Sequence, residues 1–360
     1  MLPSELTNSA GKMSISNPLA EDLDFILSST VALWEEMRGA NLFVTGGTGF
    51  FGCWILESFL WANERLDLGA TATVLTRNPA AFEKKAAHLA HNPAINFITG
   101  DIGSFEFPEK KFDFVIHAAT DVYNQVSPLE TVDTIVEGTR RVLEFGKSCK
   151  AKKILLTSSG AVYGRQPPEL SHTDEDYAGS PNPVNLNSAY GEGKRMAELL
   201  AAIYAAENGY EVKIARCFAF VGAYLQLDGH LAVGNFIRDA LRGDAIHISG
   251  DGSPVRSYMY AADLAVWLWT ILFRGKASYP YNVGSETDVS LAELARTISK
   301  TAERRVEVKI ARKSLTSELP ERYVPQTRRA FEDLGLQATI DLETALKRTM
   351  RYYSEPNRNH

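Results

Sequence analysis

Residues 41–52 read NLFVTGGTGFFG. The apolar run 42–44 leads into glycines, and apolar residues at helical spacing follow, so the segment predicts a strand, a glycine turn and a helix. Gly46, Gly49 and Gly52 stand at GxxGxxG spacing, in which the first glycine allows a tight turn, the second lets backbone approach a pyrophosphate, and the third lets the helix pack close to the strand. The anion would lie at the helix N-terminus, where free N–H groups and the helix dipole favour negative charge. Ordinary glycine-rich turns share this spacing, but its place between a strand and a helix favours a dinucleotide-binding loop.

The composition limits the class of protein. The 360 residues are 45% hydrophobic and 23% charged, which allows a sizeable core in one large domain or two intertwined ones. A formal net charge of -6, without a long run of Lys or Arg, argues against nucleic acid as a partner. No apolar stretch approaches the roughly 20 residues of a membrane span, and the N-terminus lacks the order of a signal peptide. We therefore expect a cytoplasmic protein without a membrane partner.

The cysteines carry no chemistry in this interpretation. Cys53, Cys149 and Cys217 are widely spaced, odd in number and mostly set among apolar neighbours. We expect them to be reduced core residues rather than metal ligands or disulfides. No metal site is predicted.

Strands alternate with helices along the first half of the chain. Residues 1–18 are expected to be loose, whereas apolar spacing in residues 22–37 predicts a helix that docks on the main body. Further strands are expected at 72–75, 97–98, 112–118 and 153–158, and helices at 53–63, 80–89 and 129–149. The alternation predicts an α/β fold with a parallel sheet covered on both faces, and ligands at the carboxyl ends of its strands.

Ser159, Tyr190 and Lys194 are the candidate catalytic residues. The fifth expected strand ends in TSSGAVYG (157–164), and SAYGEGK (188–194) opens another helical pattern. Four residues apart on a helix, Tyr190 and Lys194 share a face. Lys194 and an oxidised nicotinamide would favour the phenolate and lower the tyrosine pKa from about 10 toward about 7. The alternative is a surface tyrosine beside a solvated lysine; the order of glycine loop and serine-bearing strand favours the catalytic pair.

Together these motifs resemble the extended short-chain dehydrogenase/reductases that modify nucleotide sugars. The likeness covers about residues 40–354, and its markers are TGGTGFFG (45–52), GD (100–101), HAA (117–119), SSGAVYG (158–164), YxxxK (190–194) and GDGSPVRSYMY (250–260). The resemblance implies a Rossmann-type doubly wound parallel sheet with a smaller, interleaved C-terminal substrate-binding domain. It also implies Tyr190 as general acid/base, Lys194 as its electrostatic partner and ribose ligand, and Ser159 as hydrogen-bond donor to the reacting sugar oxygen.

The resemblance implies further contacts with cofactor and substrate. Asp101 would contact the adenine, although a turn role is the alternative. Arg256 would bind the nucleotide diphosphate, for which a planar guanidinium is suited, or form a surface salt bridge. Asn235 would open a helix that faces the phosphates, or act only as its N-cap. The remaining implied cofactor contacts are Gly46, Gly49, Phe50, Phe51, Gly52, Ile102, Ala118 and Ala119, and Gly160 joins Ser159 as a substrate contact.

Positions just after Ser159 separate this chain from the sugar dehydratases of the family. Those enzymes carry acidic residues there, because they must remove a proton and expel water. Gly160 and Ala161 occupy these places, and neither transfers a proton, which argues against dehydration and the related decarboxylation. The family's usual asparagine shortly after the strand ending at Phe218 is Ala219 here. Substrate contacts near that residue are expected to differ.

The end of the second strand bears on the choice of cofactor. An acidic residue about 20 or more positions past the glycines normally binds the ribose 2′-OH of NAD. Here the strand ends in Leu75-Thr76-Arg77-Asn78, without a carboxylate. Arg77 could pair with a 2′-phosphate, which favours NADP(H) over NAD(H). Its alternative role, stacking on adenine, would serve either cofactor.

The expected domain organisation follows from the resemblance. Residues 1–38 would be an N-terminal extension with a docking helix. Residues 39–218 plus about 257–275 would form the dinucleotide-binding domain, and about 219–256 plus 276–356 the nucleotide-sugar-binding domain. The resemblance also suggests a homodimer through the helices near 129–148 and 189–206.

We expect hydride transfer at C4 of a nucleotide-diphosphate sugar. The cofactor interpretation favours a 4-ketoreductase, whereas family frequency favours a 4-epimerase, an isomerase that uses the same residues. A non-catalytic dinucleotide sensor or scaffold is the competing class. Such a protein would be expected to lose Tyr190 or Lys194, and this chain keeps both.

Overall fold

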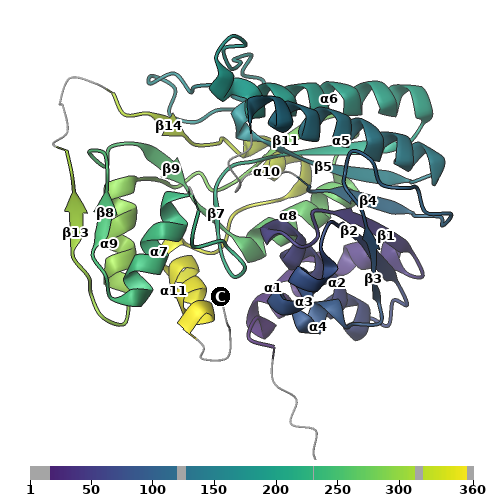
Figure 1. The fold of residues 1–360 in the computed structure, drawn as a ribbon, viewed down its shortest axis with the longest axis horizontal. Coiled ribbons are helices and arrows are strands. Elements are labelled where there is room, and N and C mark those ends of the chain that lie inside the picture. Colours follow the sequence, from purple (N-terminus) through teal and green to yellow (C-terminus); the bar gives the residue numbers. More distant parts are fainter. Residues whose placement is uncertain (1–16, 120–126, 230, 313–318, 355–360) are drawn as a thin grey trace, which may run out of the picture.

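A parallel sheet forms the centre of the molecule. The computed structural model describes residues 17–119, 127–229, 231–312 and 319–354. Within these residues the sheet has seven strands, all parallel, in the order β11-β6-β5-β4-β1-β2-β3 (Figure 1). Its strands are β1 (Asn41–Thr45), β2 (Thr71–Thr76), β3 (Ile95–Thr99), β4 (Phe114–His117), β5 (Lys153–Ser159), β6 (Glu211–Cys217) and β11 (Pro280–Val283).

The strand order reverses at β1. From this strand the chain builds outward through β2 and β3 on one side, and through β4, β5, β6 and β11 on the other. The predicted Rossmann-type doubly wound α/β fold is therefore confirmed. In such sheets the ligand crevice lies outside the carboxyl ends of the strands where the order reverses, here between β1 and β4.

Helices cover both faces of the sheet. They are α2 (Phe50–Arg65), α5 (Pro128–Ser148), α6 (Ala189–Asn208) and α8 (Ala261–Arg274). Helices α5 and α6 pack side by side on one face, and α2 and α8 lie on the other (Figure 1). Successive residues of β1 alternate between these faces, as a strand requires: Phe43 packs under α5 and α6, and Val44 under α2 and α8.

Local signals set the ends of several helices. Ser127 and Glu130 form a capping box at the start of α5, with Pro128 as its first residue. The single helix expected at 80–89 is instead α3 (Pro79–Lys85) and α4 (Ala87–Ala90). The break lies at Ala86, whose φ of −149° is not helical and whose methyl group is buried.

The N-terminal helix docks on the sheet domain and on the last helix. The expected helix at 22–37 is α1 (Ala20–Thr30), continued by a 3-10 helix, η1 (Val31–Met37). Helix α1 packs against α2 and α8. Its buried Asp22 accepts a hydrogen bond from the Tyr260 hydroxyl at 2.6 Å and forms an ion pair with Arg348 of α11. The expected loose segment at 1–18 lies almost wholly outside the described residues.

The smaller part of the molecule lies beside the carboxyl edge of the sheet (Figure 1). Its elements are β7 (Phe220–Val221), α7 (Ala232–Arg242), β8 (Ile246–Ile248), β9 (Val255–Ser257), β10 (Met259–Tyr260), β12 (Asp288–Ser290), α9 (Leu291–Thr301), β13 (Val308–Ile310), β14 (Arg322–Tyr323) and α11 (Leu342–Ser354). Helix α10 (Arg328–Leu334) packs instead against β11 and α8 of the sheet domain. Strands β12, β9 and β14 form a small sheet of their own. One apolar core runs from α2 and α8 into this part through Phe236 and Leu346. In the described ranges, none of the helices combines enough length and apolar character to span a bilayer.

Candidate active site

The predicted catalytic residues converge at the carboxyl end of β5. Ser159 is the last residue of β5, and Tyr190 and Lys194 lie on the first turns of α6. The buried Lys194 ammonium group donates a hydrogen bond to the Thr157 carbonyl at 2.8 Å and lies 5.9 Å from the centre of the Tyr190 ring. The Ser159 hydroxyl hydrogen-bonds Tyr190. The structure therefore brings this predicted set together.

Burial controls the protonation of these groups. It raises the pKa of Tyr190 to about 12, although the hydrogen bond from Ser159 lowers that pKa in part. Burial also lowers the pKa of Lys194 to about 8, against the opposing influence of Cys217 and Glu198. Tyr190 is thus a protonated phenol at neutral pH, because losing hydration destabilises the phenolate. The expected pKa near 7 is therefore not observed, and Lys194 is not among the groups that shift the pKa of Tyr190 here.

Ser159 begins a short 3-10 helix, η2 (Gly160–Tyr163). Its oxygen accepts a hydrogen bond from the Ala161 N–H at 3.1 Å. A Cβ atom at Gly160 would lie 2.6 Å from the Phe218 ring and 2.8 Å from the Tyr323 hydroxyl. A larger side chain at residue 160 would therefore require Phe218 or Tyr323 to move.

Tyr323 is a site residue that sequence reasoning missed. Its hydroxyl lies 3.4 Å from the Ser159 hydroxyl, and its ring packs on Phe218 with centroids 4.6 Å apart. It belongs to the two-residue strand β14, far along the chain from the catalytic motifs. No local sequence signal marks it, because its position depends on the pairing of β14 with β9.

The glycine loop has the form expected of a nucleotide cradle. Gly46 has a φ of +71°, and a Cβ atom there would lie 2.5 Å from the backbone of Ala118. Gly52 packs equally close to the Gly46 carbonyl. At Gly49, in contrast, the nearest atom to an added Cβ is the Gly46 oxygen at 3.3 Å. Packing therefore requires glycine at residues 46 and 52. Gly49 is the position where the protein backbone would approach a pyrophosphate.

The other residues predicted to contact the cofactor around this loop offer backbone N–H groups, while the phenylalanine side chains among them lie in the protein core. Phe50 is buried, and Phe51 packs edge-to-face on Phe220 at 5.1 Å, so both side chains face the protein interior. Their N–H groups lie in the first turn of α2, which has no side-chain cap, and are suited to an anion. The Ala119 N–H, at the end of β4, donates to the Thr45 hydroxyl at 3.3 Å.

Residues beyond β2 and β3 bear on the adenine end. Arg77 is exposed directly after β2, and Asn78 caps α3 by accepting a hydrogen bond from Ala81 N–H at 3.0 Å. The Asp101 side chain accepts a hydrogen bond from the Gly103 N–H at 2.9 Å. The alternative turn role of Asp101 is therefore observed. Ile102 packs beside Gly138 of α5. The adenine contacts of Asp101 and Ile102 stay predictions.

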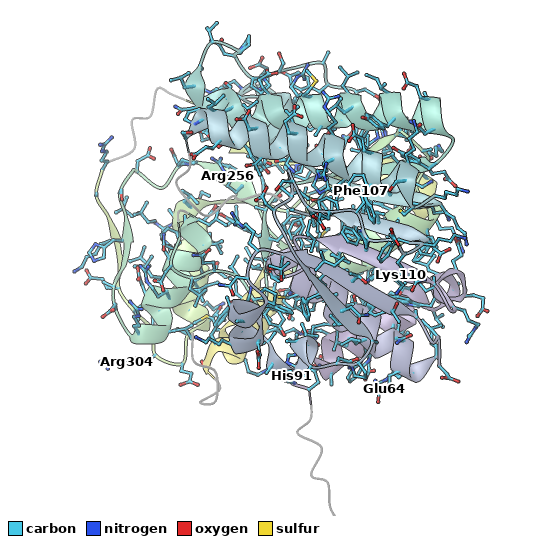
Figure 2. The ribbon with its side chains drawn as sticks, turned by 45° about the vertical axis from the view of Figure 1, so that its right-hand side comes forward. Glu64, His91, Phe107, Lys110, Arg256 and Arg304 are labelled. Atoms are coloured by element: carbon cyan, nitrogen blue, oxygen red, sulfur yellow. The ribbon has the colours of Figure 1, made fainter. Side chains whose placement is uncertain are left out.

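Two predicted phosphate contacts have different surroundings. Arg256 forms an ion pair with Glu321 at 2.6 Å, the salt bridge considered as its alternative. Figure 2 shows Arg256 where the smaller part adjoins the sheet domain, whereas Arg304 lies at the far edge of the smaller part. The expectation that Asn235 opens a helix is wrong. It lies inside α7, where its side chain donates to the Gly229 carbonyl at 2.9 Å, and Leu231 occupies the N-cap.

Buried polar groups support the catalytic strand from behind. The Arg216 guanidinium of β6 donates hydrogen bonds of 2.8 to 3.2 Å to the Glu198 carboxylate of α6, and Ser158 donates to the same carboxylate. Arg216 also donates to the Tyr163 hydroxyl at 2.8 Å, which in turn donates to Asn282 of β11 at 2.8 Å. This network ties β5, α6 and β11 together beside the site.

His117 is a structural residue at the end of β4. Its ring nitrogens contact the hydroxyls of Thr45 and Thr139 at 2.8 and 3.1 Å. Burial, and secondarily the charge of Lys194, lowers the pKa of His117 to about 3, so the ring stays neutral. Among the described residues, no group of three or more His, Cys, Asp or Glu side chains is placed to hold a metal ion. The three cysteines are buried and free.

Comparison with known proteins identifies relatives of this arrangement. Residues 42–284 match the NAD dependent epimerase/dehydratase family. UDP-glucuronic acid decarboxylase 6 of Arabidopsis thaliana is 32% identical over 309 residues, which cover 85% of this chain and 86% of that protein. UDP-glucuronic acid decarboxylase 1 of Danio rerio is 29% identical and covers 90% of this chain and 75% of that protein.

Solved structures share the fold. The UDP-glucose 4-epimerase of Thermotoga maritima, solved with UDP-glucose, superposes with a TM-score of 0.72 at 23% identity and covers 87% of this chain and 98% of that one. The UDP-glucuronic acid 4-epimerase of Bacillus cereus, solved with NAD, superposes with a TM-score of 0.73 at 21% identity and the same coverage.

Proposed function

Because the chain belongs to the NAD dependent epimerase/dehydratase family, we propose that it is an oxidoreductase that transfers hydride at C4 of a nucleotide-linked sugar. The observation that carries the proposal is the convergence of Ser159, Tyr190 and Lys194 at the end of β5. Gly49 at the N-cap of α2, and a first helical turn without a side-chain cap, fit a dinucleotide at the adjoining strand ends.

Reduction of a 4-keto sugar is the reaction that the NADP(H) interpretation favours. A bound reduced nicotinamide supplies hydride to C4. Tyr190 gives its proton to the oxygen on C4, and the Ser159 hydroxyl holds that oxygen by a hydrogen bond. The Lys194 charge, one turn away, stabilises the phenolate that remains. The carbonyl is thereby converted to a hydroxyl, and Tyr190 takes up a proton from solvent before the next turnover.

A 4-epimerase is the second candidate, supported by the solved 4-epimerases with this fold. It uses the same residues, with Tyr190 first removing the proton of the C4 hydroxyl and later returning it. Decarboxylation, the activity named for the relatives with similar sequence, is not proposed. Gly160 and Ala161 follow Ser159, and the wall over Gly160 consists of Phe218 and Tyr323.

NADP(H) is the proposed cofactor, with NAD(H) as the alternative that the family name and the NAD-bound structure support. NADP(H) is supported by the exposed Arg77 after β2 and by the absence of a carboxylate in residues 75–78. Asn78 already uses its side-chain oxygen to cap α3. Titrating the protein with each cofactor and following tryptophan fluorescence decides between them.

A homodimer through α5 and α6 is also proposed. Three apolar side chains on one face of α6 are exposed, Met196 by 44%, Leu199 by 54% and Ile203 by 41%. Their spacing of three and four residues forms a stripe suited to a second copy of the helix pair.

The decisive experiment combines substrate screening with one substitution. The purified protein is mixed with a panel of nucleotide sugars and 4-keto sugars, and the nicotinamide absorbance and the products are followed. Stoichiometric loss of reduced cofactor supports the reductase, and product without net loss supports the epimerase. Tyr190→Phe should bind cofactor normally while nearly abolishing turnover. Unchanged turnover in this variant would refute the function assigned to Tyr190.

A further inference from the structure

The phenol of Tyr323 stands in the catalytic site on an element of the smaller part. Its oxygen lies 3.4 Å from the Ser159 hydroxyl and 3.5 Å from the Cys217 carbonyl. Both distances are at the long end for hydrogen bonds, as is common in sites without substrate. Stacking on Phe218 holds the ring in place. Tyr323 and Tyr190 therefore both have a hydroxyl in reach of Ser159.

The Ser159 hydroxyl proton can point in different directions, depending on which hydrogen bonds Ser159 forms. A serine hydroxyl donates one hydrogen bond and accepts two. The Ala161 N–H fills one acceptor position at 3.1 Å. In the absence of a sugar the Ser159 proton goes to Tyr190. When Ser159 donates instead to a sugar oxygen, the remaining acceptor position can take the proton of Tyr323. When Tyr323 instead donates to the Cys217 carbonyl, its oxygen can accept the proton of Ser159, which then points away from the sugar.

From this geometry we propose that Tyr323 is a positioning residue, which turns the Ser159 hydroxyl toward the reacting oxygen by donating a hydrogen bond to it. The inference rests on the proposed function, since it assigns Ser159 a substrate oxygen to hold. Burial raises the pKa of Tyr323 above its ordinary value, so the phenol keeps its proton over the neutral range. Tyr323 therefore remains a hydrogen-bond donor over the neutral pH range, and it takes no part in the transfer of the substrate proton.

The register of the small sheet links this role to substrate binding. Tyr323 of β14 is paired with Arg256 of β9, and the guanidinium lies 5.9 Å from the tyrosine ring. Arg256 is the residue expected to bind the diphosphate. Binding of the phosphates would thus fix the same pair of strands that carries the phenol. Energy from a remote part of the substrate would in this way contribute to orienting Ser159.

A double-mutant cycle tests the inference directly. The variants are Tyr323→Phe, Ser159→Ala and the double substitution, with Tyr210→Phe as matched control. Tyr210 also has a buried phenol bonded to a backbone carbonyl, that of Leu143 at 3.0 Å, but it precedes β6 at the opposite end of the strand. Phenylalanine at 323 keeps the stacking on Phe218 and removes only the hydroxyl.

The expected result is a loss that depends on Ser159. Tyr323→Phe should lower kcat by about tenfold with little change in KM, the size expected for one lost hydrogen bond in the transition state. In the Ser159→Ala background the same substitution should change kcat by less than about twofold. The limb of the pH profile that reports Tyr190 should move to higher pH, because a freely turning Ser159 hydroxyl lowers the pKa of Tyr190 less. Tyr210→Phe should leave kcat and the pH profile unchanged.

A second readout needs neither substrate nor cofactor. The urea midpoints of the four proteins in the cycle should be non-additive if the two hydroxyls are coupled. Equal kcat losses from Tyr323→Phe in both backgrounds, or additive midpoints, would overturn the inference. Failure of the proposed function is recognised separately, because Tyr190→Phe would then retain turnover whatever the cycle shows.

Discussion

The Nζ atom of Lys194 lies 5.9 Å from the centre of the Tyr190 ring and donates to the Thr157 carbonyl at 2.8 Å. The Thr157 carbonyl carries no charge, and the lysine side chain is buried. This explains why its pKa falls to about 8. Burial of the charged form of Lys194 therefore lowers the stability of the protein.

Stability should depend on pH through Lys194. Its pKa is about 8 in the folded protein and 10.5 ordinarily, so between these values the unfolded chain binds more protons. The free energy of unfolding should therefore rise from pH 8 to pH 10.5, by on the order of 3 kcal/mol relative to Lys194→Met. Urea unfolding of both proteins at several pH values measures the difference. Parallel pH curves would contradict the assigned burial.

Alanine at two glycines should separate folding from cofactor binding. Gly46→Ala places a Cβ at positive φ and 2.5 Å from Ala118, so it should lower the free energy of unfolding by more than about 2 kcal/mol. Gly49→Ala places its methyl group 3.3 Å from the Gly46 carbonyl oxygen, a milder contact at an N-cap, and should change the free energy of unfolding by less than about 1 kcal/mol. Cofactor affinity of Gly49→Ala should nevertheless fall by about tenfold or more, because the added methyl group lies where the pyrophosphate fits. Normal affinity in that variant would argue against a nucleotide cradle.

Breaking the ion pair behind the site should be costly. The Glu198 and Arg216 side chains are only 12% and 14% exposed. Glu198→Gln leaves the guanidinium without a carboxylate and should lower the free energy of unfolding by about 3 kcal/mol, and kcat as well. Glu137→Gln, which breaks the exposed pair with Arg140, is the control and should cost less than about 1 kcal/mol. Urea unfolding compares the two; equal effects would mean that the network is not stabilising.

Removing the carboxylate that now pairs with Arg256 should tighten substrate binding. Glu321 is half exposed and competes with a diphosphate for the same guanidinium. Glu321→Gln should strengthen binding of a nucleoside diphosphate by roughly twofold to fivefold, since exposed pairs contribute up to about 1 kcal/mol. Arg256→Gln should weaken binding strongly. Calorimetric titration with UDP and TDP gives both values, and identical affinities for all three proteins would remove Arg256 from the site.

A charge in the apolar stripe of α6 should separate the dimer. Leu199→Glu places a carboxylate at the centre of the stripe and should yield a monomer in sedimentation velocity, because burying an unpaired charge is unfavourable. Phe331→Glu, an exposed apolar position on α10, is the control and should leave the sedimentation coefficient unchanged. A monomeric unsubstituted protein, or a dimer that survives Leu199→Glu, would contradict the proposed interface.

Features that depend on short sequence spacing could be predicted. The glycine loop lies within twelve residues, and the Tyr190–Lys194 pair within one helical turn. The strand-helix alternation predicted the parallel sheet covered on both faces, because parallel strands need crossover helices, and the family resemblance added its doubly wound order. The division of the helix at 80–89 was missed, since nothing in its apolar spacing marks the non-helical Ala86.

Features that depend on distant pairing or on burial could not be predicted. Tyr323 reaches Ser159 only through the ladder between β14 and β9. The direction of the Tyr190 pKa shift depends on desolvation, which a sequence does not quantify. The predicted helix start at Asn235 is about one turn too late, because the residues from Ala232 onward are already helical.

Asp22 links two ends of the described chain through its hydrogen bond with Tyr260 and its ion pair with Arg348. It fastens the first helix of the described chain to the last one, on the side of α11. If the smaller part swings away to admit a sugar nucleotide, α11 stays anchored. Strand β14 is held to the sheet domain as well, because Arg322 donates to the Ser171 carbonyl at 3.2 Å and the Val324 N–H to Gln166 at 3.0 Å. A movement that admits substrate would therefore have to leave both attachments in place.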